Sequence, residues 1–340
     1  MSAERTLRDA CVGYASVAIA GTAKNAGKTT ALNHLIAAFS RGGERLGLSS
    51  IGRDGEAVDQ ITHRPKPRIV PPVGTLVATS HESALYSQAT LVLREPTPFR
   101  TALGPVGIYE VRSAGFVEVA GPVKVREAAA LLRQLQRLGA ERVLLDGAAD
   151  RRAFISCGVD AFVLATGLVL GEDVSAVVSE TKFILDRLQL PEPAPAWQAR
   201  CLGLDAPGAL SPAGFTPWVA DTLLSDLGRL PGWLPAGAEA LYVPGAVSDA
   251  LLEVLLEARL TVDLIVPSGT HLLASQEHLG RWMKRGRTCH ALRPVRAIAL
   301  TVNPTAPDGR TCAPEQLRMA LSEAFPDLPV FDVEASAPER

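Results

Sequence analysis

Residues 16–30, SVAIAGTAKNAGKTT, decide the fold of the first part of the chain. They begin as an apolar run of strand-favouring residues and break into a loop that ends in Gly-Lys-Thr-Thr. The residues that follow, ALNHLIAAF, have the spacing of an amphipathic helix. A strand that passes through such a loop into a helix places backbone N–H groups and the positive end of the helix dipole around one point. The stretch therefore predicts a phosphate-binding loop.

Residue types within this loop suit a bound nucleotide. Lys28 would reach the β- and γ-phosphates, and the Thr29 hydroxyl would bind Mg²⁺. Gly27 lets the backbone approach the phosphates because no side chain stands in the way. The predicted nucleotide-binding positions are Gly21, Thr22, Ala23, Lys24, Asn25, Ala26, Gly27, Lys28, Thr29 and Thr30.

The spacing departs by one residue from the usual pattern, G-x-x-x-x-G-K-[ST]. Thr22 occupies the first position of that pattern, and the glycine stands one residue earlier, at Gly21. The form Gly-Thr-x-x-x-x-Gly-Lys-Thr resembles the loop of dethiobiotin synthetase and of the cobalamin-pathway amidotransferases, which are ATP enzymes. Minicell-type ATPases of the same branch carry an extra lysine where this chain has Ala23, so its trans-acting role is not carried over. The alternative is a glycine-rich turn with a solvated lysine.

Two other strand ends carry acidic residues. Residues 142–147, RVLLDG, predict an apolar strand that contains Asp146 at its end, and residues 46–51 predict a strand that runs into a turn with Asp54 and Glu56. Ligands of open parallel sheets bind at the carboxyl ends of the strands. We therefore predict that Asp146 holds Mg²⁺ through water. The candidate catalytic residues are Lys28, Asp54 and Asp146, and the candidate metal-binding residues are Thr29, Asp54 and Asp146.

Three weaker candidates lie elsewhere. Residues 59–72 are proline-rich without a hydrophobic period and predict a surface loop that acts as a switch or as a plain connector. The pair Arg151-Arg152 follows the Asp146 strand and would contact phosphate if it is not simply exposed. Asn303 and Thr305 follow a predicted strand and would bind a small ligand, although a turn leading into a helix is favoured.

The chain has 340 residues, enough for two α/β domains. Residues 1–190 predict a P-loop NTPase domain with a mainly parallel sheet flanked by helices. Proline and glycine become frequent over 191–235, which predicts a connecting segment. Strands alternate with helices again over 236–340, which predicts a second, smaller α/β domain.

Composition excludes several classes of function. The 34 basic and 36 acidic residues give no electrostatic reason to expect nucleic acid or an anionic membrane as partner. The five cysteines are scattered without a C-x-x-C pair, which is typical of reduced thiols in a cytoplasmic protein and disfavours a zinc site. No uninterrupted apolar segment is long enough to span a bilayer. Mg²⁺ is the one metal that the sequence implies.

Three stretches together resemble a narrower family: GTAKNAGKTTALNHL, SIGRDGEAVDQITHRPKPRI and LLDGAADRRAF. They are similar to the P-loop subunit of the lysine 5,6-aminomutase reactivase, as are VNPTAPDG and PVFDV near the C-terminus. The resemblance implies an ATPase that works with a MutS-like ATPase subunit to restore a cobalamin- and pyridoxal-phosphate-dependent aminomutase. It also implies that Lys28 and Thr29 hold ATP and Mg²⁺, and that Asp146 anchors the metal shell. Asp54 or Glu56 would orient the attacking water.

Other activities fit the same loop. An ATP-dependent ligase or kinase that phosphorylates a small carboxylate, like dethiobiotin synthetase, needs the same positioning and charge neutralisation. No N-K-x-D motif that would read guanine stands at a suitable place, so ATP is favoured over GTP. A binding module without hydrolysis is disfavoured because Lys28, Thr29 and Asp146 are all present. The oligomeric state is left open.

Overall fold

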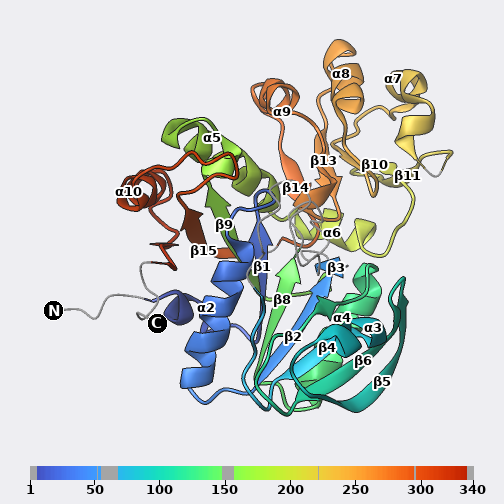
Figure 1. Cartoon of the computed structure of the whole chain (residues 1–340). Coiled ribbons are helices and arrows are strands. Elements are labelled where there is room, and N and C mark those ends of the chain that lie inside the picture. Colours follow the sequence, from blue (N-terminus) through green and yellow to red (C-terminus); the bar gives the residue numbers. More distant parts are fainter. Residues whose placement is uncertain are drawn as a thin grey trace. The chain divides into compact units, whose positions relative to one another are not determined.

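The computed structural model describes residues 6–51, 53–54, 68–147, 157–220, 222–294 and 296–334, with the side chains of Arg53 and Asp54 left aside (Figure 1). The chain forms two compact units, residues 1–182 with 295–340 and residues 183–294. Helix α5 (Val174–Leu188) contains the boundary between them. Within the described residues, no helix has the length and apolar character needed to cross a membrane.

The first unit is built on a nine-stranded sheet with the order β16-β15-β9-β1-β8-β2-β4-β6-β5. The strands from β16 to β4 pair in parallel, whereas β6 and β5 are antiparallel, so the mainly parallel sheet predicted from the sequence is present. The strand bounds are β1 Ser16–Gly21, β2 Leu46–Ile51, β4 Leu76–Ser80, β5 Leu91–Thr101, β6 Gly104–Val111, β8 Arg142–Gly147, β9 Ala161–Gly167, β15 Arg296–Asn303 and β16 Val330–Phe331.

Helices cover both faces of this sheet. α2 (Lys28–Arg41) packs Leu35 into the same core cluster as Leu144 of β8. Leu135 of α4 (Val125–Arg137) lies near Val143 of β8. A Cβ built on Gly47 of β2 would lie 3.3 Å from the Leu135 side chain and 3.2 Å from that of Val143. Successive strand residues point to opposite faces, so α2 and α4 lie on opposite sides of β8. The other elements of this unit are α1 Leu7–Cys11, β3 Arg53–Asp54, α3 His81–Tyr86, β7 Val119–Ala120, η2 Leu168–Leu170 and α10 Pro314–Ala324.

The second unit holds a five-stranded mixed sheet with the order β11-β10-β12-β13-β14. Its core surrounds Trp282, which is fully buried. Its strands are β10 Gly208–Ser211, β11 Gly214–Pro217, β12 Ala240–Tyr242, β13 Asp263–Val266 and β14 Cys289–Ala291. Its helices are α6 Pro195–Cys201, η3 Leu223–Ser225, η4 Leu227–Arg229, α7 Leu230–Trp233, α8 Asp249–Glu257, η5 Gly269–His271 and α9 Gln276–Met283.

The predicted domain boundaries need two corrections. Residues 236–340 do not form one domain, because β15 pairs in parallel with β9 and β16 pairs with β15 in the nine-stranded sheet. Residues 191–235 are not a connector, because they supply α6, β10 and β11 to the second unit. Alternating strands and helices predict an α/β unit. They do not tell which sheet a strand joins.

Candidate functional site

The junction between β1 and α2 has the geometry of an open helix start. β1 is buried over its whole length, and the Thr22 N–H after it donates to the Ala165 carbonyl at 2.9 Å. Gly27 is the N-cap of α2 with a φ of 93°, a backbone conformation that glycine adopts without strain. No side chain caps this helix, so its first N–H groups are not satisfied by the chain's own cap. Thr29 and Thr30 lie in its first turn.

An ion pair joins this helix start to the neighbouring strand. Lys28 Nζ lies 2.9 Å from Asp146 Oδ1, and the two side chains are 13% and 3% exposed. β8 runs between β1 and β2, in register at Asp146 with Ile19 and with Ser50, so the carboxylate stands at the carboxyl edge of the sheet. Figure 1 shows these three strands pointing in the same direction. Asp146 is buried and Lys28 is partly buried, so the pairing of the two charges holds the ammonium beside the loop.

Asn303, the last residue of β15, reaches the loop from a distant part of the sequence. Its Nδ2 donates to the Asn25 carbonyl at 2.7 Å, and its Oδ1 accepts the Thr305 N–H at 3.1 Å. Asn25 has a φ of 64° in the left-handed region. A Cβ built on Gly27 would lie 3.3 Å from the Cβ of Asn303, so this side chain packs directly against the loop backbone.

The turn leading into a helix that the sequence favoured at Asn303 is not what the structure shows, because α10 begins only at Pro314. Gly167, at the end of β9, makes room for Asn303: a Cβ there would lie 2.8 Å from the Asn303 Cβ. The sequence signal was an asparagine at a strand end. Its contact with the loop depends on β15 pairing with β9, which the sequence pattern did not reveal.

Buried hydroxyls fasten another segment to the same sheet edge. Ser50 Oγ accepts the Gly121 N–H at 2.9 Å, and Thr79 Oγ1 accepts the Ala120 N–H at 2.9 Å. The two hydroxyls donate to carbonyls of the same segment, Val119 at 3.2 Å and Glu118 at 2.9 Å. β7 is therefore held against the ends of β2 and β4.

Some predicted residues or their side chains lie outside the described part of the chain. The backbone of Asp54 pairs with Val119 as part of β3, but its side chain lies outside the described residues. Glu56, residues 59–67 and the pair Arg151-Arg152 also lie outside them. The roles proposed for these residues stay predictions. Among the described residues, no group of three or more His, Cys, Asp or Glu side chains is placed to hold a metal ion by itself.

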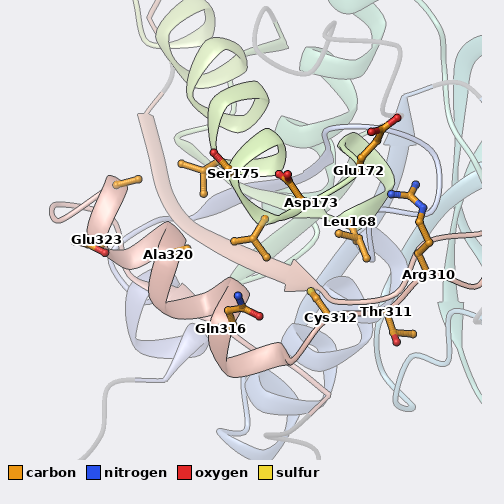
Figure 2. A pocket seen from close by; sticks show the side chains of 13 residues that line it. Leu168, Glu172, Asp173, Ser175, Arg310, Thr311, Cys312, Gln316, Ala320 and Glu323 are labelled. Carbon is orange, nitrogen blue, oxygen red and sulfur yellow. The ribbon is translucent and has the colours of Figure 1, made fainter.

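A cavity of about 900 Å³ opens between the start of α5 and α10 (Figure 2). Glu172 and Asp173 line it on one side, and Cys312 and Gln316 line it on the other. Arg310 donates to the Gly171 carbonyl at 2.7 Å and ties the two sides together. The lining starts at Leu168, directly after Gly167, whereas Lys28 and Asp146 do not take part in it. A small molecule would fit in this space.

Neither the loop nor the cavity has an activated cysteine nucleophile among the described residues. Burial raises the pKa of Cys11, Cys157, Cys201 and Cys289 to about 12, and it also raises the pKa of Cys312. A thiol with so high a pKa is protonated at neutral pH and is a poor nucleophile.

Comparison with known proteins does not place the chain in a family. No protein-family model matches it, and no curated protein matches it significantly. Its function has to be inferred from its residues and their geometry.

Proposed function

We propose that the chain binds ATP with Mg²⁺ at residues 21–30 and hydrolyses it. The observation that carries this proposal is the contact of 2.9 Å between Lys28 and Asp146, at the start of a helix that no side chain caps. An uncapped helix N-terminus attracts an anion through its free N–H groups and its dipole. A lysine in the first turn adds a full positive charge, and a nearby carboxylate is the group that holds Mg²⁺ through water.

Local features support the fit of a nucleotide with its metal. Thr22 Oγ1 is buried and has no hydrogen-bond partner among the described residues, so a ligand oxygen could satisfy it. Mg²⁺ usually keeps several waters and takes one or two carboxylates together with phosphate oxygens. The site therefore does not need a cluster of three acidic side chains. Asp146, with Thr29 in the first turn of α2, would supply the protein's share.

The chain's own groups would act by position and charge. Lys28 is held by Asp146, so its ammonium is fixed before the phosphates arrive and loses little freedom when it contacts them. The N–H groups of α2 would bind the equatorial oxygens, on which negative charge is spread in the transition state. Bound Mg²⁺ would neutralise phosphate charge. Asp54 is the candidate for orienting the attacking water.

The biological role that we propose is that of a reactivase component, a chaperone-like ATPase for a cobalamin-dependent aminomutase. This part rests on the resemblance of GTAKNAGKTTALNHL, the segment that follows β2 and LLDGAADRRAF to that family. A MutS-like ATPase subunit and the aminomutase itself would then be the partners.

One observation favours a second function. The cavity of about 900 Å³ beside η2 is within the size range of small-molecule sites. A ligase or kinase that phosphorylates a small carboxylate would need such a space close to its phosphate loop. The cavity is lined by Glu172, Asp173 and Glu323 and by a single arginine, Arg310, which suits a carboxylate poorly. The hydrolase is therefore the first choice.

The test is nucleotide turnover by the wild-type chain and by Lys28→Ala, with ATP and with GTP. Lys124→Ala is the matched control, because Lys124 also stands at a helix start but its side chain is 81% exposed. Hydrolysis that needs no second substrate and is lost only in Lys28→Ala would support the hydrolase. Turnover that requires an added carboxylate would favour the ligase or kinase. Equal activity of Lys28→Ala and wild type would remove the site assignment.

A further inference from the structure

Asn303 lies outside the loop and contacts the loop's backbone through its side chain. Its carboxamide is fixed at both ends, because Nδ2 donates to the Asn25 carbonyl and Oδ1 accepts the Thr305 N–H. The two contacts also define the orientation of the amide, since only the nitrogen can donate and only the oxygen can accept. These two hydrogen bonds therefore hold the Asn303 side chain in one orientation.

The Asn303 side chain contacts the loop backbone at Asn25 and Gly27, and it also packs against Gly167 at the end of β9. Gly27 and Gly167 approach Asn303 so closely that a Cβ on either would lie 3.3 Å or 2.8 Å from its Cβ. Asn25 holds a left-handed conformation with a φ of 64°, which is uncommon for residues other than glycine. A hydrogen bond to its carbonyl fixes the peptide group between Asn25 and Ala26, directly before the N-cap of α2.

We propose that Asn303 is a positioning residue that holds the phosphate loop in its binding conformation through the Asn25 carbonyl. The inference rests on the proposed function and adds a determinant from the other end of the chain, 278 residues away from Asn25. If the carbonyl were released, the loop would have to be ordered when the ligand binds. Affinity would fall by the cost of that ordering. The loss would concern the phosphates alone and would not depend on the nucleoside.

The experiment measures dissociation constants for MgATP and for magnesium tripolyphosphate, which carries the phosphates without a nucleoside. Asn303→Ala removes the donor, and Asn303→Asp keeps the acceptor for Thr305 but cannot donate to Asn25. Asn33→Ala is the matched control, because Asn33 Nδ2 also donates to a backbone carbonyl, that of Arg68, at 2.8 Å. Thermal unfolding without ligand reports any general loss of stability.

We expect Asn303→Ala to bind MgATP and magnesium tripolyphosphate about tenfold more weakly, by the same factor for each ligand, as the loss of one hydrogen bond predicts. Asn303→Asp should bind both ligands more weakly still, because its carboxylate also repels the phosphates. Asn33→Ala should bind both as wild type does. A loss confined to MgATP would overturn the inference, because Asn303 would then contact the nucleoside. Unchanged affinity with a lower unfolding temperature would also overturn it. If the wild-type chain bound neither ligand, the proposed function itself would fail and the inference with it.

Discussion

Helix α2 of the first unit starts differently from helices α8 and α9 of the second unit, although α1 and α3 of the first unit also have side-chain caps. In the second unit, Ser248 caps α8 and Ser275 caps α9, and each hydroxyl accepts a backbone N–H of its own helix. In the first unit, α2 starts at Gly27 without any side-chain cap. A serine cap satisfies the N–H groups that an anion would otherwise bind. The missing side-chain cap of α2 is the feature on which the proposed anion site depends.

An uncapped start is not sufficient by itself. α10 also lacks a side-chain cap, but Pro314 occupies its first turn and removes one N–H donor. What distinguishes α2 is Lys28 in contact with the buried carboxylate of Asp146. The four predictions that follow test this difference, beginning with the largest effect.

The packing of Asn303 against Gly167 should give the largest effect. In Gly167→Ala the new Cβ would overlap the Asn303 backbone carbonyl, so the end of β9 or β15 must move. We expect a loss of about 3 kcal/mol in the free energy of unfolding of the first unit and a loss of nucleotide binding. Calorimetry of the full chain measures it. Gly245→Ala in the second unit is the control, because nothing lies within 4 Å of a Cβ there. Equal stability of both variants would show that the tight contact is not rigid.

The carboxylate at the sheet edge should affect both turnover and stability, because Asp146→Asn removes the charge that pairs with Lys28. In Asp146→Asn the charge that pairs with Lys28, and that would hold the metal shell in the proposed site, is lost while the shape is kept. We expect turnover of ATP to fall about 10- to 100-fold, as for other groups that act around a bound metal. Asp263→Asn is the control in the second unit, where this carboxylate accepts from the Thr288 N–H at 3.1 Å. If Asp263→Asn reduces turnover as much as Asp146→Asn does, the assignment of the site to the first unit is contradicted.

Removal of a helix cap should lower the stability of the second unit without changing the affinity for nucleotide. Ser275→Ala deletes the hydroxyl that accepts the His278 N–H at 3.4 Å. We expect the unfolding free energy of the second unit to fall by about 1 kcal/mol, because one helix N–H group loses its partner. The dissociation constant for MgATP should stay at the wild-type value. A weaker affinity for nucleotide in this variant would contradict the assignment of the site to the first unit.

The smallest effect should be a dependence of stability on pH. Burial lowers the pKa of His271 below its usual 6.5, so the unfolded chain takes up a proton more readily than the folded chain. The stabilising contribution of neutral His271 is therefore complete above pH 6.5 and is lost as the pH falls from there through the lowered pKa.

His271→Gln should flatten this part of the pH profile for the second unit, measured by denaturant unfolding between neutral and acidic pH. His34, whose pKa burial also lowers, provides the corresponding test in the first unit through His34→Gln. If His271→Gln keeps the full slope, another group must be responsible for it.

Much of the local structure could be predicted from the sequence. The apolar runs 46–51 and 142–147 form β2 and β8 with the expected bounds, and the helical spacing of ALNHLIAAF lies within α2. These predictions succeed because a period of hydrophobic residues reports which face of an element is buried. The same pattern placed Asp146 at a strand end, and the structure brings it beside Lys28. The roles of both residues toward a ligand stay predictions.

The sequence by itself determined the connection of β1, loop and α2, because strand preference, glycine and helical period all act over neighbouring residues. Only the tertiary structure decided that the chain returns after residue 294 to pair β15 with β9, which brings Asn303 onto Asn25. The physical reason is that parallel pairing joins distant segments through backbone hydrogen bonds and buried side chains of common types. The residues of β15 do not by themselves predict that it pairs with β9.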